Sequence, residues 1–243
     1  MDSDESKSLE PQGPDYVAST AKAFLGAVPF VGSLLVELAG TIVPNQRMDR
    51  IAEFAGKLEA RLSVLEQDFV RAHLSDPQFT DLMEEGLNQA ARAVSAERRA
   101  QIAELVSRSL TPEDITFSES KHLLRILGEL NDVEVIRLGS YQYPALGSDS
   151  AQTYRAKHGA VLARVLANSY SSQRDQDKAA LQESYDLHLE RLGLLRKRFA
   201  IEPRTKVPEF DTRTGAQKVR GYELTRLGRL MCRQVGILEE EQG

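Results

Sequence analysis

The sequence contains a single cysteine, Cys232, and none of the short motifs that mark the common cofactor-dependent enzymes. One cysteine cannot form an intramolecular disulfide, so nothing indicates an oxidising compartment and a cytoplasmic location is expected. The phosphate-binding G-x-x-x-x-G-K, dinucleotide-binding G-x-G-x-x-G, nucleophile G-x-S-x-G and Cys-x-x-Cys patterns are all missing from the 243 residues. We therefore expect no cofactor and no enzymatic activity.

The sequence also lacks a pattern of metal ligands. Two histidines separated by four residues would place two ligands on one face of a helix, as in many zinc sites. No such pair occurs, and we expect no metal site. The histidines are instead scattered singly: His73, His122, His158 and His188.

The composition indicates a folded chain with two polar ends. Apolar residues make up 41% and charged residues 28% of the sequence, which supplies enough apolar side chains for a globular core. The length favours one large or two modest domains. Residues 1–15 carry five acids without the basic-then-apolar order of a secretory signal, so they are predicted to be a disordered tail. Residues 239–243 are predicted to be an acidic tail.

Residues 16–117 are predicted to form a helical region that contains an unusual apolar segment. Between Phe24 and Val43 the only ionisable side chain is Glu37, and four glycine or proline residues interrupt the run. The length approaches the roughly 20 residues of a bilayer span, but proline breaks a helix and an acid is costly inside a membrane. We interpret the segment as a buried helical hairpin. Reversible membrane insertion or peripheral association is one alternative, and a constitutive span is another.

Four residues of this segment are candidates for contacts with the core or with a membrane: Phe24, Phe30, Leu34 and Glu37. A membrane-associating effector would depend on the three apolar side chains, and its location would be peripheral at the inner membrane. Glu37 fits a functional acid whose pKa is raised by apolar surroundings. The interpretation we favour is that Glu37 lies at a helix boundary, or that its carboxylate extends to the polar surface.

A heptad pattern follows, with apolar residues at alternating steps of four and three. The pattern predicts one amphipathic helix. Its apolar positions are Ile51, Ala55, Leu58, Leu62, Leu65 and Phe69. Fewer than three heptads more often mark packing inside a helical bundle than a two-chain coiled coil. We therefore expect packing within the chain, with a homodimer as the alternative.

Capping residues and apolar periodicity predict further helices up to residue 192. Asp76-Pro77 breaks the heptad pattern before a new helix, Thr111-Pro112 carries the hydroxyl and proline of a helix start, and Asn131-Asp132 is expected to cap another helix. Ser148-Asp149 begins a helix whose predicted apolar stripe extends to Leu166. The last long helix ends at Gly193, where glycine is expected to adopt the left-handed C-cap conformation.

The last third of the chain differs in pattern and in charge. The runs Leu194–Ile201 and Lys218–Leu224 are short, partly alternating and separated by prolines and glycine, which predicts a β-hairpin with a long polar tip. Thr225 is expected to cap a final helix. Between Glu190 and Arg233 there are twelve basic and five acidic residues, although the net charge of the whole chain is -5. A basic surface of this kind suits phosphates or an acidic partner.

Five basic residues would gather on neighbouring strands of the hairpin as a candidate surface for a partner protein or for nucleic acid. These residues are Arg196, Lys197, Arg198, Lys218 and Arg220. Contact with DNA requires such charge, because phosphate neutralisation supplies most of the non-specific affinity. The preceding helix is a less convincing reader of the major groove, because it carries five acids. These acids are Asp175, Asp177, Glu183, Asp186 and Glu190.

Two short sequence segments flank the predicted hairpin: L-E-R-L-G-L-L at 189–195 and Y-E-L-T-R-L-G at 222–228. This order of helix, basic hairpin and closing phrase resembles the C-terminal half of winged-helix domains. With the first and second helices placed between residues 121 and 138, the resemblance covers about 118–238. It implies a winged-helix-like α+β domain with a β-hairpin wing. A helix at 154–166 departs from the pattern, because the fold normally has a short link there.

The complete layout resembles uncharacterised bacterial proteins of the abortive-infection alpha type. The shared features are the interrupted apolar N-terminal segment, the helical middle and the Leu-Thr-x-Leu-Gly phrase at 224–228. The resemblance implies a bacterial protein with a role in phage defence or stress.

The sequence therefore predicts a mainly α protein in which a helical region precedes a winged-helix-like domain. We expect a non-enzymatic interaction or regulatory protein whose partner is another protein. A winged-helix nucleic-acid binder is the first alternative. A membrane-associating effector that acts through residues 24–43 is the second.

Overall fold

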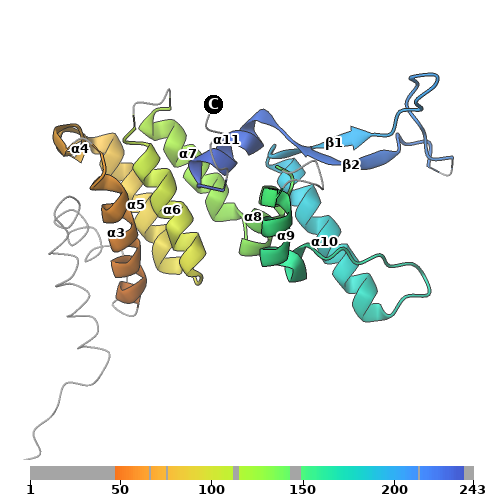
Figure 1. Ribbon diagram of the computed structural model, residues 1–243, viewed down its shortest axis with the longest axis horizontal. Coiled ribbons are helices and arrows are strands. Elements are labelled where there is room, and N and C mark those ends of the chain that lie inside the picture. The colour runs from red at the N-terminus through yellow and green to blue at the C-terminus, as the bar shows by residue number, and fades with distance from the viewer. Residues whose placement is uncertain are drawn as a thin grey trace, which may run out of the picture. The chain divides into compact units, whose positions relative to one another are not determined.

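The computed structural model describes residues 47–65, 67–74, 76–111, 115–142, 149–212 and 214–237. In this part the chain is mainly helical with one two-stranded antiparallel sheet (Figure 1), which confirms the coarse prediction. The chain forms two compact units, and the boundary between them lies between Arg125 and Ile126. The apolar segment 24–43, with its four candidate residues Phe24, Phe30, Leu34 and Glu37, lies outside the described residues, as do both predicted tails. None of the described helices has the length and apolar character needed to cross a membrane.

The first unit is built from helices. They are α3 (Met48–Leu62), α4 (Gln67–Leu74), α5 (Pro77–Arg92), α6 (Ala96–Arg108) and the first part of α7 (Phe117–Glu129). The start of α5 follows from its sequence, because the Asp76 side chain accepts a hydrogen bond from Gln78 N and Pro77 occupies the first turn. Ser95 caps α6 in the same way by accepting from Arg98 N.

The apolar face of α3 packs into the core of this unit, against α5 and α6. Its heptad residues Ile51, Ala55, Leu58 and Leu62 are fully buried. The prediction of a single helix through Phe69 is wrong, because the chain turns at residues 63–65 before α4 begins. Apolar spacing survives this short turn, so periodicity did not reveal it.

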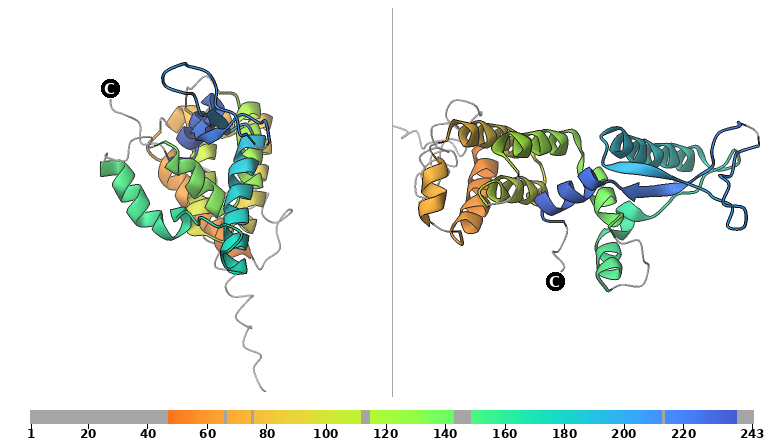
Figure 2. Two further views of the ribbon diagram at one scale, coloured as in Figure 1. Left: turned by 90° about the vertical axis from the view of Figure 1, so that its right-hand side faces the viewer. Right: turned by 90° about the horizontal axis from the view of Figure 1, so that it is seen from above.

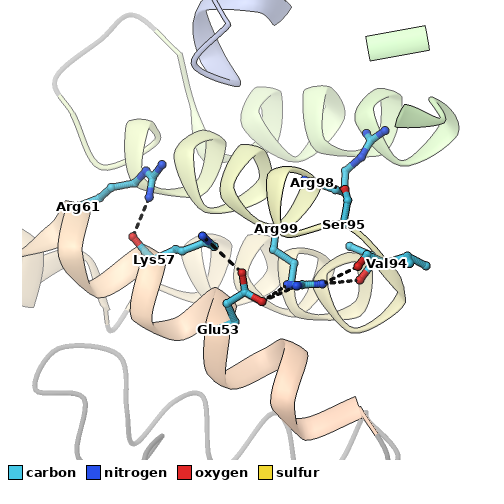
Figure 3. Close-up of polar contacts among 8 residues, drawn as sticks. Glu53, Lys57, Arg61, Val94, Ser95, Arg98 and Arg99 are labelled. Carbon is cyan, nitrogen blue, oxygen red and sulfur yellow. Dashed lines mark hydrogen bonds and ion pairs between the residues drawn. The ribbon is translucent and has the colours of Figure 1, made fainter. Parts of the chain in front are cut away.

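A cluster of charges joins α3 to the start of α6 (Figure 3). Arg99 donates to Glu53 through Nε at 2.8 Å and also through Nη2. Its Nη1 donates to the carbonyl oxygens of Ala93, at 2.8 Å, and Val94, at 3.2 Å. Lys57 lies 3.4 Å from the other Glu53 oxygen. A nearly buried guanidinium thus satisfies one carboxylate and the end of α5 together.

A second cluster lies farther along the same two helices. Glu104 accepts from Arg61 Nε at 2.5 Å and from Arg108 Nε at 2.8 Å. Burial alone would raise the pKa of Glu104, but the hydrogen bonds from both arginines outweigh it and hold the pKa below 4.5. The carboxylate is therefore more acidic in the folded chain than in the unfolded chain.

This difference predicts a loss of stability in acid. A group with a depressed folded pKa stabilises the fold above its unfolded pKa, and the contribution disappears as the pH falls through the folded pKa. The Glu104→Gln variant should lose about 1 kcal/mol of unfolding free energy at pH 7 and should depend less on pH below 4.5 than the wild type. Urea unfolding at a series of pH values measures both effects.

Glu129→Gln, which removes an exposed carboxylate on α7, is the matched control and should follow the wild-type pH profile. Parallel profiles for the wild type and Glu104→Gln below pH 4.5 would contradict the assignment.

Besides the last turn of α7, the described part of the second unit contains four helices and the two strands of the hairpin. They are α8 (Asp132–Ser140), α9 (Asp149–Leu162), α10 (Gln173–Arg191), β1 (Leu195–Phe199), β2 (Val219–Leu224) and α11 (Arg226–Gln234). Local signals place several boundaries. Asn131 and Glu134 form a capping box at the start of α8, and Gly193 ends α10 with a φ of 74°. These caps confirm the predicted helix start at 131 and helix end at 193.

The hairpin was predicted and is confirmed, with Leu195 opposite Leu224 and Arg196 opposite Glu223. The register of the two strands shifts between Arg198 and Phe199. Two isolated β-bridges lie farther toward the tip of the hairpin. Figure 1 and the right view of Figure 2 show the hairpin projecting beyond the helices of its own unit.

The segment 222–228 holds α11 against the base of the hairpin. The Thr225 hydroxyl caps α11 by accepting from Gly228 N at 2.9 Å and donates to the Gly193 carbonyl at 2.6 Å. Thr225 N donates to the carbonyl of Leu194 at 3.0 Å. An added Cβ at Gly228 would lie only 2.2 Å from that same Leu194 oxygen. Threonine and glycine are therefore both needed for the close approach of α11 to the end of α10.

The apolar stripe predicted to reach Leu166 is wrong at its end. Helix α9 stops at Leu162, and Leu166 lies in the following loop with 85% of its surface exposed. Helix α10 is also less buried than its apolar residues suggested, because Leu181 is exposed and only Asp186 and Leu189 are buried. Most of α10 is thus a solvent-exposed helix held by its C-terminal turns.

Candidate functional site

The five predicted basic residues do lie on the hairpin, but on both of its faces. Arg196 and Arg198 alternate with Lys197 along β1, so Lys197 points to the opposite face. Lys218 immediately precedes β2, and Arg220 lies within it at the position of the pairing shift. The structure brings the residues onto one ribbon and does not gather them on one face.

Acidic residues pair with the basic residues of β1. Arg196 Nε lies 2.7 Å from Glu223 on the opposing strand, and Arg198 Nε lies 3.8 Å from the same carboxylate. Lys197 reaches Glu190 of α10 at 2.8 Å, and this hydrogen bond raises the pKa of Lys197. The expected concentration of positive charge is therefore partly neutralised within the unit.

The remaining two basic residues differ from each other. Lys218 Nζ lies 3.4 Å from Glu209. Arg220 forms no ion pair with a residue of the described chain and is exposed. Cross-strand neighbours are about 5 Å apart, so the hairpin pattern alone could have indicated the pairing of Glu223 with Arg196.

The apolar side chains of the hairpin were not singled out from the sequence, and the structure shows them exposed. Each of five residues exposes between 43% and 54% of its surface: Phe199, Ile201, Val207, Phe210 and Val219. We call these five residues the apolar ribbon. Basic side chains flank it along both strands. Large exposed apolar groups rimmed by charge are typical of protein-binding surfaces.

A buried polar cluster holds α8 against α10. Arg137 pairs with Asp186 through Nε at 3.1 Å and Nη2 at 2.6 Å, and the Tyr141 hydroxyl donates to Asp186 at 3.1 Å. The Arg137 and Asp186 side chains are only 12% and 10% exposed. Burial, followed by the negative charge of Asp186, raises the pKa of Tyr141, so its hydroxyl remains a donor.

This cluster corrects one prediction. Asp186 was counted among the five acids that oppose entry of this helix into a major groove, but it is buried and paired with Arg137 of α8. The partners are 49 residues apart in the chain, so no sequence spacing could have found them. A second contact of the same kind joins Glu134 to His188 Nδ1 at 2.7 Å.

Two other kinds of chemical site, a metal site and a reactive cysteine, find no support in the described residues. In the described ranges no three His, Cys, Asp or Glu side chains lie close enough to hold a metal ion. Burial raises the pKa of Cys232 to about 12, which leaves its thiol protonated and inaccessible. Searches of protein-family models, curated proteins and solved structures yield no match to this chain.

Proposed function

We propose that this is a non-enzymatic interaction protein whose hairpin binds an acidic surface of another protein. The exposed apolar ribbon supports the proposal most directly, because its five large side chains are about half exposed. They belong to the hairpin and its tip, which Figure 1 shows projecting beyond the helices of this unit. Such side chains supply binding energy when a partner covers them. The flanking basic residues favour a partner with acidic groups around an apolar groove.

The proposal includes a winged-helix-like fold for residues 118–238. Its support is the order of elements, since α10 leads directly into the hairpin and α11 follows it. Contacts of α11 with β2 and α8 also suit a closing helix. Helix α9 lies between α8 and α10, where the winged-helix pattern has a short link, and is interpreted as an insertion. The defence or stress role implied by the family resemblance belongs to the same proposal.

Nucleic-acid binding is the second candidate, and Arg220 is the observation that favours it. Arg220 is exposed on the wing and carries a charge that no described carboxylate neutralises. The acids Asp177 and Glu183 remain exposed on α10, which opposes insertion of that helix into a groove. For this reason we place protein binding first. The membrane-associating alternative depends on residues 24–43 and is tested separately by flotation with anionic liposomes.

Site-specific photocrosslinking in cells tests the protein-binding proposal. A photoreactive phenylalanine analogue at Phe210 should crosslink one protein that is absent when the analogue replaces Tyr170. Tyr170 is the matched control because it is an aromatic residue, 97% exposed, that lies outside the hairpin. The purified partner should then bind a Phe199→Ser/Phe210→Ser variant at least about tenfold more weakly than the wild type.

The competing outcome is measured with the same purified proteins. Fluorescence anisotropy with labelled duplex DNA at low and moderate salt should show no tight binding. Steeply salt-dependent DNA binding that is lost in Arg220→Ala, together with no specific crosslink at position 210, would overturn the protein-binding proposal in favour of the nucleic-acid alternative.

A further inference from the structure

A cleft of about 510 Å³ opens beside the buried polar cluster of the second unit. Residues of α8, α9, the loop after α9 and α10 line it. The volume lies within the range of small-molecule pockets, and the lining mixes a few charged groups with apolar surface. No residue of β1 or β2 is among those that line this cleft.

The cleft has an excess of positive charge. Its lining contains three arginines, Arg137, Arg155 and Arg164, and one acid, Asp186. Asp186 is already bound by Arg137 through two hydrogen bonds. The side chains of Arg155 and Arg164 form no hydrogen bond or ion pair with another described residue. Two guanidinium groups are thus available for an anionic ligand that enters the cleft.

Local structure holds Arg164 at this place. The side chain of Gln182 on α10 accepts from Val165 N at 3.0 Å and donates to the carbonyl of Ala163 at 2.7 Å. These two bonds fix the backbone on both sides of Arg164. The loop therefore presents its arginine from a defined position, which lowers the entropy cost of binding.

Helix α9 supplies another part of the cleft lining. Arg155 and Gly159 lie on either side of a kink in α9 at His158, and both line the cleft. No atom lies within 4 Å of a Cβ placed at Gly159, so the wall is open there. Leu162 adds apolar surface next to the charged groups.

We propose that this cleft binds a small phosphate monoester with an apolar or aromatic body. The monoester carries nearly two negative charges near neutral pH and matches the two guanidinium groups that have no side-chain partner among the described residues. Arginine binds phosphate oxygens through paired N–H donors, which gives both affinity and orientation. A carboxylate offers only one charge, so the cleft favours the phosphate over a carboxylate with the same body.

Isothermal titration calorimetry on the full-length protein tests this proposal, with phenyl phosphate, benzoate and inorganic phosphate as probes. Phenyl phosphate should bind with 1:1 stoichiometry, and at least about tenfold more tightly than either other probe. Arg155→Gln and Arg164→Gln should each weaken binding by about tenfold. Arg174→Gln, which removes an exposed charge on α10 outside the cleft, should leave the affinity unchanged.

Gly159→Leu provides a test that removes no charge. Its side chain should fill the open part of the cleft and abolish binding, while the melting temperature stays at or above the wild-type value because leucine favours helix more than glycine does. Undiminished binding by folded Gly159→Leu, or no saturable heat from any probe up to about 10 mM, would overturn the proposal. Benzoate binding as tightly as phenyl phosphate would overturn the assignment of ligand class.

Discussion

Gly228→Ala is expected to destabilise the second unit by about 3 kcal/mol, although it adds only one methyl group. The added Cβ would lie 2.2 Å from the Leu194 carbonyl oxygen and 3.1 Å from the Leu194 carbonyl carbon. Because the obstacle is backbone, a change of side-chain rotamer cannot relieve it. The helix must move away, and the hydrogen bond from Thr225 N to the Leu194 carbonyl must stretch or break.

Urea denaturation followed by circular dichroism measures this loss, and Gly159→Ala is the matched control. Both glycines lie in helices, but a Cβ at residue 159 meets no atom within 4 Å. Intrinsic helix propensity should therefore stabilise Gly159→Ala by up to about 1 kcal/mol. Equal unfolding midpoints for the two variants would show that α11 does not depend on the close approach at residue 228.

Asp186→Ala is expected to cost about 3 kcal/mol, because it leaves a nearly buried guanidinium without its carboxylate. Arg137 would lose both of its hydrogen bonds to Asp186, and the Tyr141 hydroxyl would lose its acceptor. Asp177→Ala removes an exposed carboxylate from the same helix and should change the unfolding free energy by less than about 0.5 kcal/mol. Chemical denaturation of the two variants gives the comparison.

The double variant Arg137→Leu/Asp186→Leu separates pairing from simple loss of packing. Replacement of both buried charges by apolar side chains often costs less than removal of one partner. We expect the double variant to be more stable than Asp186→Ala. A double variant that is less stable by the sum of the two single losses would contradict a coupled pair.

Local signals in the sequence predicted many helix ends correctly. The predicted caps Asn131 and Thr225 each accept a hydrogen bond from the backbone N–H three residues later. Gly193 adopts the expected positive φ. These features depend on a few neighbouring residues, so a single sequence contains all the information needed to place them.

Features that depend on distant residues could not be predicted in this way. The burial of Asp186 could not be predicted, because its partner Arg137 lies 49 residues earlier in the chain. The cleft beside this pair likewise includes Arg155 and Arg164 in its lining, and no motif connects the four positions. The break after Leu62 escaped detection for a different reason, since apolar spacing continued through the turn.

The charged strand β1 has one more consequence, which concerns the two outer edges of the sheet. A sheet of two strands leaves one edge of each strand without a partner in the described chain, and such edges can template pairing between molecules. Consecutive charges at Arg196, Lys197 and Arg198, together with the irregular pairing at Arg220, oppose this edge-to-edge association. These residues thus protect a projecting ribbon with exposed apolar side chains from aggregation, whether or not a partner is bound.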